Sequence, residues 1–207
     1  VKLKNETITG FRLSVGGMHN VENVTAAIAA TLLLDIDTAK VKSAVADYKG
    51  VKRRFEYIIP PEKNAAQGYV KPVLIDDYAH HPEELNALLT SVRSLFPKRW
   101  ITVIFQPHLF SRTRDLADGF ASSLSIADEV LLLPIYPARE LPVPGITSQL
   151  ILDKITTKNK QIVTKENLER ILKEQVKQAD KRLGEVYVIA GAGDIDTLVS
   201  EIKKIII

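Results

Sequence analysis

The spacing of hydrophobic and polar positions changes at Gly50, and the two sides of that change predict different structures. Residues 2–15 alternate between polar and apolar types around Gly10, which predicts a short hairpin. Residues 20–34 are rich in alanine and leucine and predict a buried helix. Residues 38–48 predict a second helix that Gly50 ends, so we place a domain boundary there.

Beyond Gly50, short apolar runs alternate with longer segments of helical spacing. The apolar runs predict strands at 51–59, 73–78, 100–105, 129–136, 161–164 and 186–190. The segments between them predict helices at 82–96, 111–125, 147–157, 167–180 and 194–205, with a polar loop at 62–69. Strands that alternate with helices indicate a mostly parallel sheet covered on both faces. Right-handed crossovers then give a Rossmann-like, doubly wound α/β fold.

Composition and charge narrow the class of protein. With 207 residues, 45% of them hydrophobic, the chain can form one full domain and a smaller piece. It contains no cysteine, which excludes disulfides, cysteine-bound metal and a thiol nucleophile. The net charge of +3 comes from scattered lysines, which we interpret as solvated helix faces rather than a nucleic-acid surface. No apolar run approaches the roughly 20 residues of a membrane span, and the first residues do not form a signal peptide.

Polar and charged side chains follow the predicted strands at one end. Ligands of parallel α/β sheets bind beyond the carboxyl ends of the strands. The segments that follow these ends are 76–82, 106–115, 136–140 and 191–194. The first three bring carboxylates, imidazoles and guanidiniums from distant parts of the chain to one edge. We therefore predict the functional site at this edge of the sheet.

The acidic and imidazole candidates also have structural interpretations. Asp76 and Asp77 lie between a strand and a helix, so they are either turn or capping residues, or contacts to a ribose hydroxyl or to magnesium. His80 and His81 are either helix caps or imidazoles that bind a carboxylate or orient a nucleophile. No third ligand follows at zinc spacing, so we do not expect a structural zinc site.

Arg112 and Arg114 lie near a predicted helix start, where a cation opposes the helix dipole. Local stability therefore does not explain them, whereas bidentate binding of a carboxylate or phosphate does. The alternative is a pair of surface ion pairs with Asp115 and Asp118.

Three further features have two interpretations each. Arg53 and Arg54, inside the first strand beyond the boundary, are edge-strand charges or contacts to a nucleotide. Asn20 and Asn23 straddle a predicted helix start and are caps or contacts to an adenine edge. The glycine-rich run 191–193 favours a tight strand-to-helix turn over a phosphate loop.

Five segments together resemble the Mur ligase family. They are GMHNVENVTAAIAA (17–30), GVKRRFEYI (50–58), IDDYAHHPEEL (75–85), VIFQPHLFSRTRDL (103–116) and YPARELPVPGI (136–146). The first is similar to the end of the central ATPase domain of these enzymes, and the second to the opening of their carboxy-terminal domain. The last three resemble the branch that adds L-alanine. The resemblance implies the end of a central ATP-binding domain at 1–50 and an amino-acid-binding Mur ligase C-terminal domain at 51–207.

The resemblance also implies a bacterial, cytoplasmic ligase of cell-wall precursor synthesis. ATP phosphorylates the carboxylate of UDP-N-acetylmuramate, the amine of L-alanine attacks the acyl phosphate, and Mg²⁺ and arginines offset the charge of the transferring group. The resemblance assigns contacts with ATP to Asn20, Asn23, Arg53, Arg54 and Asp77. It assigns contacts with the amino acid and with the muramate carboxylate to six residues: Tyr78, His80, His81, His108, Arg112 and Arg114. Of these, it implies a catalytic role for His81, Arg112 and Arg114.

One departure from the family limits what the chain does alone. The family phosphate loop has the form G-x-x-G-K-T, and no Gly-Lys followed by Ser or Thr occurs here. The chain also begins without Met, so we expect a piece of a longer enzyme, inactive by itself, that lacks the Mg²⁺ ligands and the UDP-binding domain. A ligase that recycles whole peptides and a non-catalytic nucleotide-binding module remain as alternatives. A dehydrogenase domain is not expected, because the glycine-rich run follows the last strand rather than the first.

Overall fold

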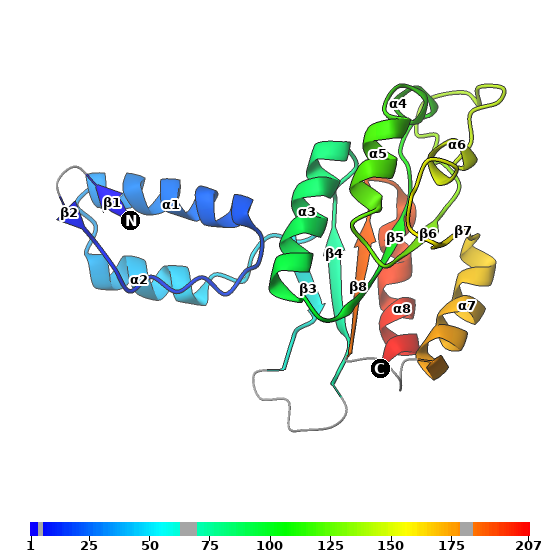
Figure 1. Cartoon of the computed structure of the whole chain (residues 1–207). Helices are drawn as coiled ribbons and strands as arrows, with labels where there is room; N and C mark the ends of the chain where they lie inside the picture. Colours follow the sequence, from blue (N-terminus) through cyan, green and yellow to red (C-terminus); the bar gives the residue numbers. More distant parts are fainter. Residues whose placement is uncertain (4–5, 63–69, 179–183) are drawn as a thin grey trace. The chain divides into compact units, whose positions relative to one another are not determined.

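The computed structural model describes residues 1–3, 6–62, 70–178 and 184–207 and divides into two compact units, Val1–Val51 and Lys52–Ile207. Figure 1 shows the elements of both units along the chain. Residues 63–69 of the predicted loop and the last two residues of the helix predicted at 167–180 lie outside the described residues. The assignment of the first unit to a central ATP-binding domain stays a prediction.

The first unit contains the predicted hairpin and two helices. Its elements are β1 (Lys2–Leu3), β2 (Glu6–Thr7), α1 (Met18–Leu33) and α2 (Thr38–Asp47). The two strands pair antiparallel. The start of α2 is fixed by Asp37, whose carboxylate accepts hydrogen bonds from the N–H groups of Ala39 and Lys40, both at 3.0 Å. Both helices are therefore confirmed. The paired strands end at Thr7, so the predicted hairpin through Gly10 is shorter than expected, and α1 is mostly exposed rather than buried, with Asn20 and Ile28 as its buried residues.

The second unit contains a six-stranded sheet in the order β3-β4-β8-β5-β6-β7. The strands are β3 (Glu56–Ile59), β4 (Val73–Asp77), β5 (Trp100–Phe105), β6 (Glu129–Leu132), β7 (Asn159–Ile162) and β8 (Glu185–Ala190). All pairs are parallel except β3 with β4. Strands β4 and β8 are buried along their whole length, as expected for parallel strands with both faces covered. The predicted α/β sheet is confirmed, with the last strand inserted between β4 and β5.

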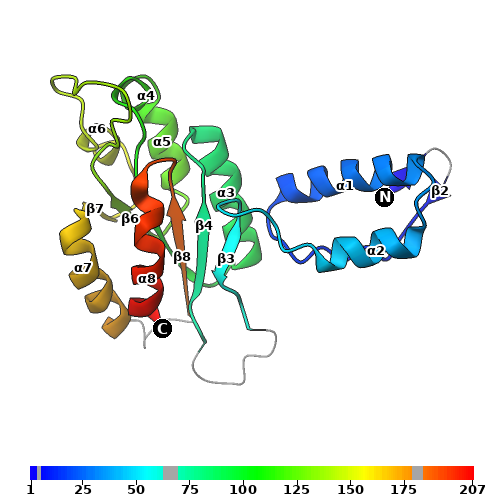
Figure 2. The ribbon, with the colours of Figure 1, turned by 180° about the vertical axis from the view of Figure 1, so that it is seen from behind.

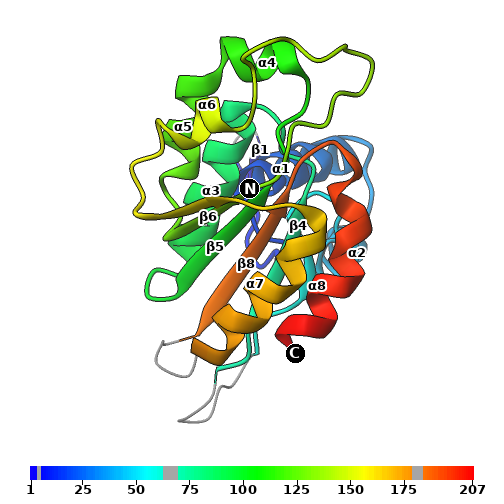
Figure 3. The same ribbon diagram turned by 90° about the vertical axis from the view of Figure 1, so that its right-hand side faces the viewer.

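Helices pack on both faces of this sheet. They are α3 (Pro82–Leu95), α4 (Phe110–Asp115), α5 (Ala117–Leu124), α6 (Gln149–Leu152), α7 (Lys165–Gln178), the 3₁₀ helix η2 (Asp194–Leu198) and α8 (Val199–Ile206). Figures 2 and 3 show α7 and α8 together on one face, with α3 and α5 on the other. Successive strand residues point to opposite faces, so Val103 packs in the core with Phe120 of α5, and Ile104 packs with Leu172 of α7 and Ile202 of α8. Burying each such side chain stabilises the fold by about 1.5–3 kcal/mol.

The strand predicted at 51–59 begins only at Glu56. Arg53 and Phe55 have φ values of 57° and 49°, which lie in the left-handed region that a strand excludes. The segment before Glu56 is therefore outside β3, and the prediction that Arg53 and Arg54 lie inside this strand is wrong. The antiparallel pairing of β3 also makes it the exception in a sheet that is otherwise parallel.

Three more predicted elements differ clearly in their bounds, and one of them is the helix predicted at 147–157, where α6 spans only Gln149–Leu152. The helix predicted at 111–125 is interrupted at Leu116. This residue has a non-helical φ of −119°, and it is both the C-cap of α4 and the N-cap of α5. The strand predicted at 129–136 ends at Leu132, two residues before Pro134, which lacks the N–H that a central strand needs. The predicted order of elements is confirmed throughout the described part of the second unit.

Candidate active site

The carboxyl ends of β4, β8, β5 and β6 lie side by side along one edge of the sheet. His108 and Tyr136 extend this edge as a parallel bridge beyond β5 and β6. The N–H of Tyr136 donates to the carbonyl of Pro107 at 2.8 Å, and the N–H of Leu109 donates to the carbonyl of Tyr136 at 3.0 Å. The structure thus brings together the segments that the sequence analysis selected.

Four rings from three segments form a continuous row at this edge. The ring centroids of Tyr78 and His80 lie 5.2 Å apart, those of His80 and His108 lie 5.9 Å apart, and both pairs meet edge to face. The rings of His108 and Tyr136 are stacked, with 5.8 Å between centroids and 19° between planes. Arg112 joins the row, because its Nη1 donates to the carbonyl of His80 at 3.4 Å. We call Tyr78, His80, His108, Arg112 and Tyr136 the histidine cluster.

His108 is held in its neutral form within this cluster. Burial, then the neighbouring Arg112, then His80, lower the pKa of its imidazole below the ordinary value, against a smaller opposing effect of Glu140. Its Nδ1 is buried and has no hydrogen-bond partner among the described residues. A buried ring nitrogen without a partner is costly unless a ligand or water completes its hydrogen bonding. His108 therefore offers an unsatisfied nitrogen to a bound molecule.

His80 and His81 have different environments although they are adjacent. The Nδ1 of His80 lies 3.0 Å from the carbonyl of Tyr78 and 3.3 Å from Glu84 Oε2. His81 is the N-cap of α3, where its Nδ1 accepts from the N–H of Glu83 at 3.5 Å and its own N–H donates to Glu84 at 3.1 Å. The capping interpretation thus describes His81, and its catalytic role stays a prediction.

The premise drawn from the helix dipole for Arg112 and Arg114 is wrong. Helix α4 is so short that both arginines lie in its last turn, where a cation is favourable. Arg114 pairs with Asp115, with 2.7 Å between Nε and Oδ1, on an exposed surface. Asp118 instead pairs with Lys154 at 2.7 Å. Within the described ranges Arg112 has no carboxylate partner. Of the two guanidiniums, that of Arg112 is therefore the one available to a ligand.

Arg53 lies at a second group of polar residues, next to the start of the second unit. Its Nη2 donates to the carbonyl of Gly191 at 2.5 Å, and its Nη1 lies 3.2 Å from Asp196 Oδ2. Its Nε lies 3.9 Å from Asp76 Oδ2, and its guanidinium lies 4.9 Å above the ring of Tyr78. Arg53 is therefore already engaged by the protein on several sides.

Asp76 is a buried carboxyl group, with 3% of its surface exposed. Burial raises its pKa to about 6; Arg53 opposes this effect, and Glu56, Asp77 and Asp196 add to it. Its Oδ1 has no hydrogen-bond partner in the part of the chain that the structure describes. A carboxyl group that is partly protonated near neutral pH and lies beside a guanidinium is a poor ligand for Mg²⁺.

Asp77 uses its carboxylate to fasten two backbone segments together. Its Oδ2 accepts from the N–H of Phe55 at 2.7 Å, and its Oδ1 accepts from the N–H of Ala79 at 2.8 Å. These charge-assisted bonds hold the turn before β3 against the end of β4. We call Arg53, Asp76, Asp77, Gly191 and Asp196 the boundary cluster. Within the described residues no group of three or more His, Cys, Asp or Glu could hold a metal ion, so the residues present do not fit Mg²⁺.

The remaining candidates for ATP contacts lie apart from this cluster or at its surface. Arg54 is exposed, and among the described residues no side-chain hydrogen bond or ion pair engages its guanidinium. Asn20 is buried in the first unit and donates through Nδ2 to the carbonyl of Gly16 at 2.7 Å. Asn23 is exposed on α1. Because the N-cap of α1 is Gly17, the prediction that the two asparagines are caps is wrong.

The glycine-rich run forms a tight turn between β8 and η2. Gly191 has a φ of 148°, and a Cβ atom there would lie 2.9 Å from the carbonyl oxygen of Gln106. A Cβ atom on Gly193 would lie 2.7 Å from Cγ of Tyr136. The glycines are therefore required by close packing against the loops after β5 and β6, in agreement with the interpretation as a turn.

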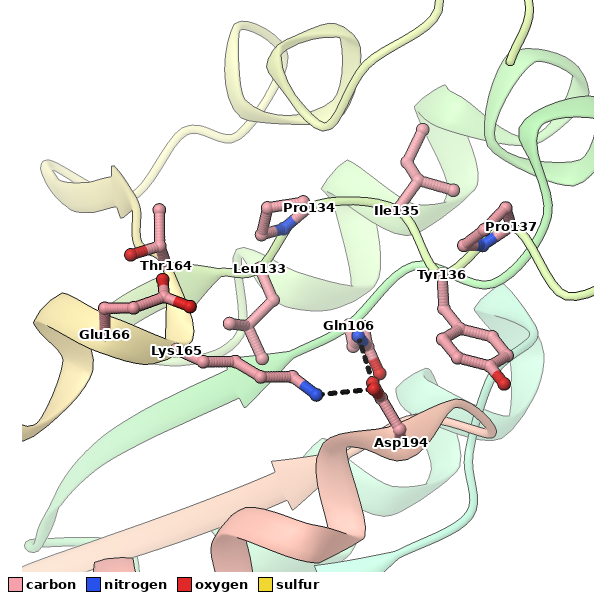
Figure 4. A pocket seen from close by; sticks show the side chains of 10 residues that line it. All are labelled: Gln106, Leu133, Pro134, Ile135, Tyr136, Pro137, Thr164, Lys165, Glu166 and Asp194. Carbon is pink, nitrogen blue, oxygen red and sulfur yellow. Dashed lines mark hydrogen bonds and ion pairs between the residues drawn. The ribbon is translucent and has the colours of Figure 1, made fainter. Parts of the chain in front are cut away.

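A cavity of about 410 Å³ lies at the same edge, beside this turn. Figure 4 shows its lining, which comes from the ends of β5 and β6, the start of α7 and the start of η2. On one side Lys165 Nζ lies 2.6 Å from Asp194 Oδ2, and Gln106 Nε2 donates to Asp194 Oδ1 at 2.9 Å. Burial raises the pKa of Asp194, but the hydrogen bonds from Lys165 and Gln106 outweigh it and hold the pKa below its ordinary value.

Two residues of the site were not assigned a role in the sequence analysis. Tyr136 completes the ring row, and Glu140 accepts hydrogen bonds from the N–H of Ser111 at 2.9 Å and from its hydroxyl. These bonds hold the pKa of Glu140 below its ordinary value and tie the loop after β6 to the start of α4. Both residues lie in the segment 136–140, whose position after a strand was the signal that could have identified them.

Comparison with known proteins gives a consistent result. The model of the family described as "Mur ligase, glutamate ligase domain" matches residues 53–193. The chain is 47% identical over 192 residues to a UDP-N-acetylmuramate–L-alanine ligase of Cytophaga hutchinsonii, and 46% identical over 206 residues to one of Flavobacterium johnsoniae. These alignments cover 93% and 100% of the chain but only 38% and 42% of those relatives, so the chain spans about two fifths of their length.

A solved structure agrees with these relatives. The UDP-N-acetylmuramate–alanine ligase of Thermotoga maritima superposes on the chain with a TM-score of 0.71 at 31% identity, over 97% of this chain and 40% of that one. In the described ranges no helix is both long and apolar enough to cross a membrane.

Proposed function

The chain belongs to the Mur ligase family, and from that premise we propose that it is the carboxy-terminal part of an ATP-dependent ligase that joins L-alanine to UDP-N-acetylmuramate. In this proposal Val1–Val51 ends a central ATP-binding domain, and Lys52–Ile207 binds the amino acid. The observation that carries the proposal is the histidine cluster, in which a guanidinium and two imidazoles from separate segments meet at the carboxyl edge of the sheet.

Arg112 suits the carboxylate of L-alanine. A guanidinium binds a carboxylate through two parallel N–H donors, and its planar shape fixes the orientation of the amino acid. Among the described residues its hydrogen-bond partner is the carbonyl of His80, at a long 3.4 Å, so most of its donors remain for a ligand. Binding the carboxylate in this way leaves the amine of L-alanine free to react.

His108 suits the amine. Its lowered pKa keeps the imidazole neutral near pH 7, and a neutral ring nitrogen accepts a hydrogen bond or a proton from an attacking amine. In the proposed reaction the amine attacks the acyl phosphate of UDP-N-acetylmuramate, the carbon–nitrogen bond forms and phosphate leaves. His80 and Tyr78 orient His108 through the ring row, and His81 is a further candidate for a catalytic role.

Of the two arginines that are candidates for a contact with ATP, Arg54 is the better candidate. It is exposed and unengaged among the described residues, whereas Arg53 is bound to Gly191 and Asp196. Asp77 is the candidate for a contact with the ribose, because a carboxylate accepts hydrogen bonds from hydroxyl groups. We propose that the upstream part of the longer protein supplies the phosphate loop and the Mg²⁺ ligands, since the residues described here fit neither task.

A titration of the chain itself tests the amino-acid site. L-alanine added to the ¹⁵N-labelled chain should shift the resonances of His80, His108 and Arg112 at millimolar concentration and leave those of Arg114 unchanged. D-alanine is the matched control, because it presents the same charges with the opposite hand. Shifts that were absent, or equal for both enantiomers, would contradict the proposed site.

A chimera tests the reaction. The carboxy-terminal part of the Cytophaga hutchinsonii ligase would be replaced by the 192 matched residues of this chain, and phosphate release would be measured with ATP, UDP-N-acetylmuramate and L-alanine. We expect the folded chimera to release phosphate only when all three substrates are present, and the 207-residue chain alone to release none. Turnover by the chain alone would contradict the view that it lacks the phosphoryl-transfer machinery.

A further inference from the structure

Tyr136 separates the histidine cluster from the cavity beside it. One face of its ring stacks on His108 at 5.8 Å, within the cluster that we propose holds L-alanine. The same side chain lines the 410 Å³ cavity, where Figure 4 shows it at the end opposite Thr164 and Glu166. A single ring therefore stands between a small site and a larger space.

The backbone that carries this ring is held on both sides. The N–H and the carbonyl of Tyr136 bond to Pro107 and Leu109, and four residues later Glu140 is bonded to Ser111. These contacts fix the loop after β6 to the loop after β5 and to α4. The ring thus has a rigid support and cannot move away with its loop.

The turn after β8 packs closely against Tyr136. Gly193 packs so closely that even one added carbon atom would lie 2.7 Å from Cγ of Tyr136. A side chain in contact with backbone on one side and with a stacked imidazole on the other has no second position of equal quality. Tyr136 therefore acts as a fixed wall rather than as a movable gate.

The cavity behind this wall has the character of a side-chain pocket. Leu133 and Ile135 are buried and give it an apolar wall, and Lys165 and Asp194 form its polar end. Gln106 is only 4% exposed, and its Oε1 has no hydrogen-bond partner among the described residues. Because ionised Asp194 accepts but cannot donate, the amide nitrogen of Gln106 must face it, which leaves Oε1 as an unused acceptor.

We infer that Tyr136 determines the specificity of the amino-acid site: its ring limits the side chain to the size of a methyl group, and without it the site opens into the neighbouring cavity. This inference rests on the proposed function, because it assumes that L-alanine binds in the histidine cluster. The ligand class that the opened site would take is an L-α-amino acid with a longer, mainly apolar side chain. L-leucine is the probe, because its side chain matches the apolar wall and needs no new polar partner.

The test compares L-alanine and L-leucine on the chain and on three variants of it. Dissociation constants are measured from ¹⁵N shifts of His108 and Arg112, after the folded state of each variant is verified from its amide spectrum. The wild-type chain should bind L-alanine and show no leucine-dependent shifts at the same concentration. Tyr136→Ala should bind L-leucine at least about tenfold more tightly than the wild type does, since apolar groups of this size discriminate by roughly 10–200-fold.

Two further variants control for loss of the ring and for loss of folding. Tyr136→Phe keeps the ring and should keep the preference for L-alanine, because bulk rather than the hydroxyl forms the wall. Tyr136→Val removes the ring but introduces a β-branched side chain suited to extended backbone, and should gain leucine binding even where the alanine variant fails to fold. Gain of leucine binding in Tyr136→Phe would assign the selectivity to the hydroxyl and overturn the inference.

The outcomes separate this inference from the proposed function. If the wild-type chain binds L-alanine and the folded Tyr136→Ala and Tyr136→Val variants still do not bind L-leucine, another residue limits the side chain. In that case only the inference fails. If the wild-type chain binds neither amino acid, the proposed amino-acid site fails and the inference fails with it. If the wild-type chain already binds L-leucine, Tyr136 sets no limit and the inference is wrong, whatever the chimera shows.

Discussion

The boundary cluster and the histidine cluster lie at the same edge of one sheet, but the protein uses them differently. In the boundary cluster the polar groups bind one another: Asp77 holds two backbone segments, and Arg53 is bound to the turn after β8 and to η2. In the histidine cluster the groups lie close together, but Arg112 and the Nδ1 of His108 keep donors and acceptors that no other described residue occupies.

This difference suggests how to divide the predicted site residues. A charged group whose partners are supplied by the protein contributes mainly to the fold, whereas a charged group without such partners is available to a ligand. Substitutions in the boundary cluster should therefore change the free energy of unfolding, and substitutions in the histidine cluster should change ligand binding.

Replacing Asp77 should produce the largest loss of stability. Asp77→Ala removes both oxygen atoms that accept from Phe55 and Ala79, and a hydrogen bond to a charged group contributes about 1.5–3 kcal/mol. We expect the free energy of unfolding to fall by about 4 kcal/mol, measured by urea denaturation. Asp118→Ala is the control, since this carboxylate is exposed and should matter far less. Equal effects in the two variants would contradict a structural role for Asp77.

The protonation of Asp76 should make stability depend on pH. Its pKa is about 6 in the folded protein against 3.8 ordinarily, so folding favours the protonated form. The stabilisation is therefore fully present below pH 3.8 and is lost as the pH rises through 6, with a change of about 3 kcal/mol.

The variant Asp76→Asn isolates that contribution. An amide does not ionise, so the variant should lose less stability than the wild type between pH 4 and pH 7 in parallel urea titrations, and should be the more stable protein at pH 7. Arg53 lowers the pKa of Asp76, so Arg53→Met in the wild-type background should increase the loss of stability between pH 4 and pH 7. If the wild type lost no more stability than Asp76→Asn between pH 4 and pH 7, Asp76 would ionise at its ordinary pKa and the prediction would be wrong.

The order of elements was predictable because buried parallel strands leave long apolar runs, as β5 and β8 do. The turn before β3 was not predictable in this way, because left-handed conformations at Arg53 and Phe55 are imposed by tertiary contacts. Among these contacts are the bonds of Asp77 to Phe55 and of Arg53 to Gly191, which join residues far apart in sequence.

The candidate site was predictable in position but less so in detail. The rule that ligands bind beyond the carboxyl ends of parallel strands selected the segments containing His80, His108 and Arg112. It could not distinguish Arg112 from Arg114, because the choice depends on the length of α4 and on the position of Asp115. Nor could it show that Tyr136 stacks on His108, since that contact depends on the bridge between these two residues beyond β5 and β6.

Replacing Arg112 should affect binding and leave folding nearly intact. Arg112→Met keeps the aliphatic stem and removes the charge, so the affinity for L-alanine should fall at least about tenfold, as expected for a lost charge-assisted hydrogen bond. The pKa of His108 should rise at the same time, because Arg112 is one of the groups that lower it. The affinity comes from an NMR titration with L-alanine at fixed pH, and the pKa from an NMR titration over pH.

Arg114→Met is the matched control for this prediction. It removes a guanidinium of equal charge from the same helix, but one that already pairs with Asp115 at the surface. It should change neither the affinity for L-alanine nor the pKa of His108. If the two variants behaved alike, net charge rather than the position of Arg112 would explain the effect.

Replacing His81 should have the smallest effect, and it decides between a cap and a catalytic group. As the N-cap of α3, His81 accepts a weak bond from Glu83 at 3.5 Å, so His81→Ala should lower the free energy of unfolding by about 0.5–1 kcal/mol. His81→Asn supplies a better cap and should restore that stability in urea denaturation. If His81 is only a cap, the Asn variant of the chimera should also keep its rate of phosphate release. A stable His81→Asn chimera with a greatly reduced rate would instead give the imidazole a role in the reaction, and would move His81 from the residues that serve the fold to those that serve the ligand.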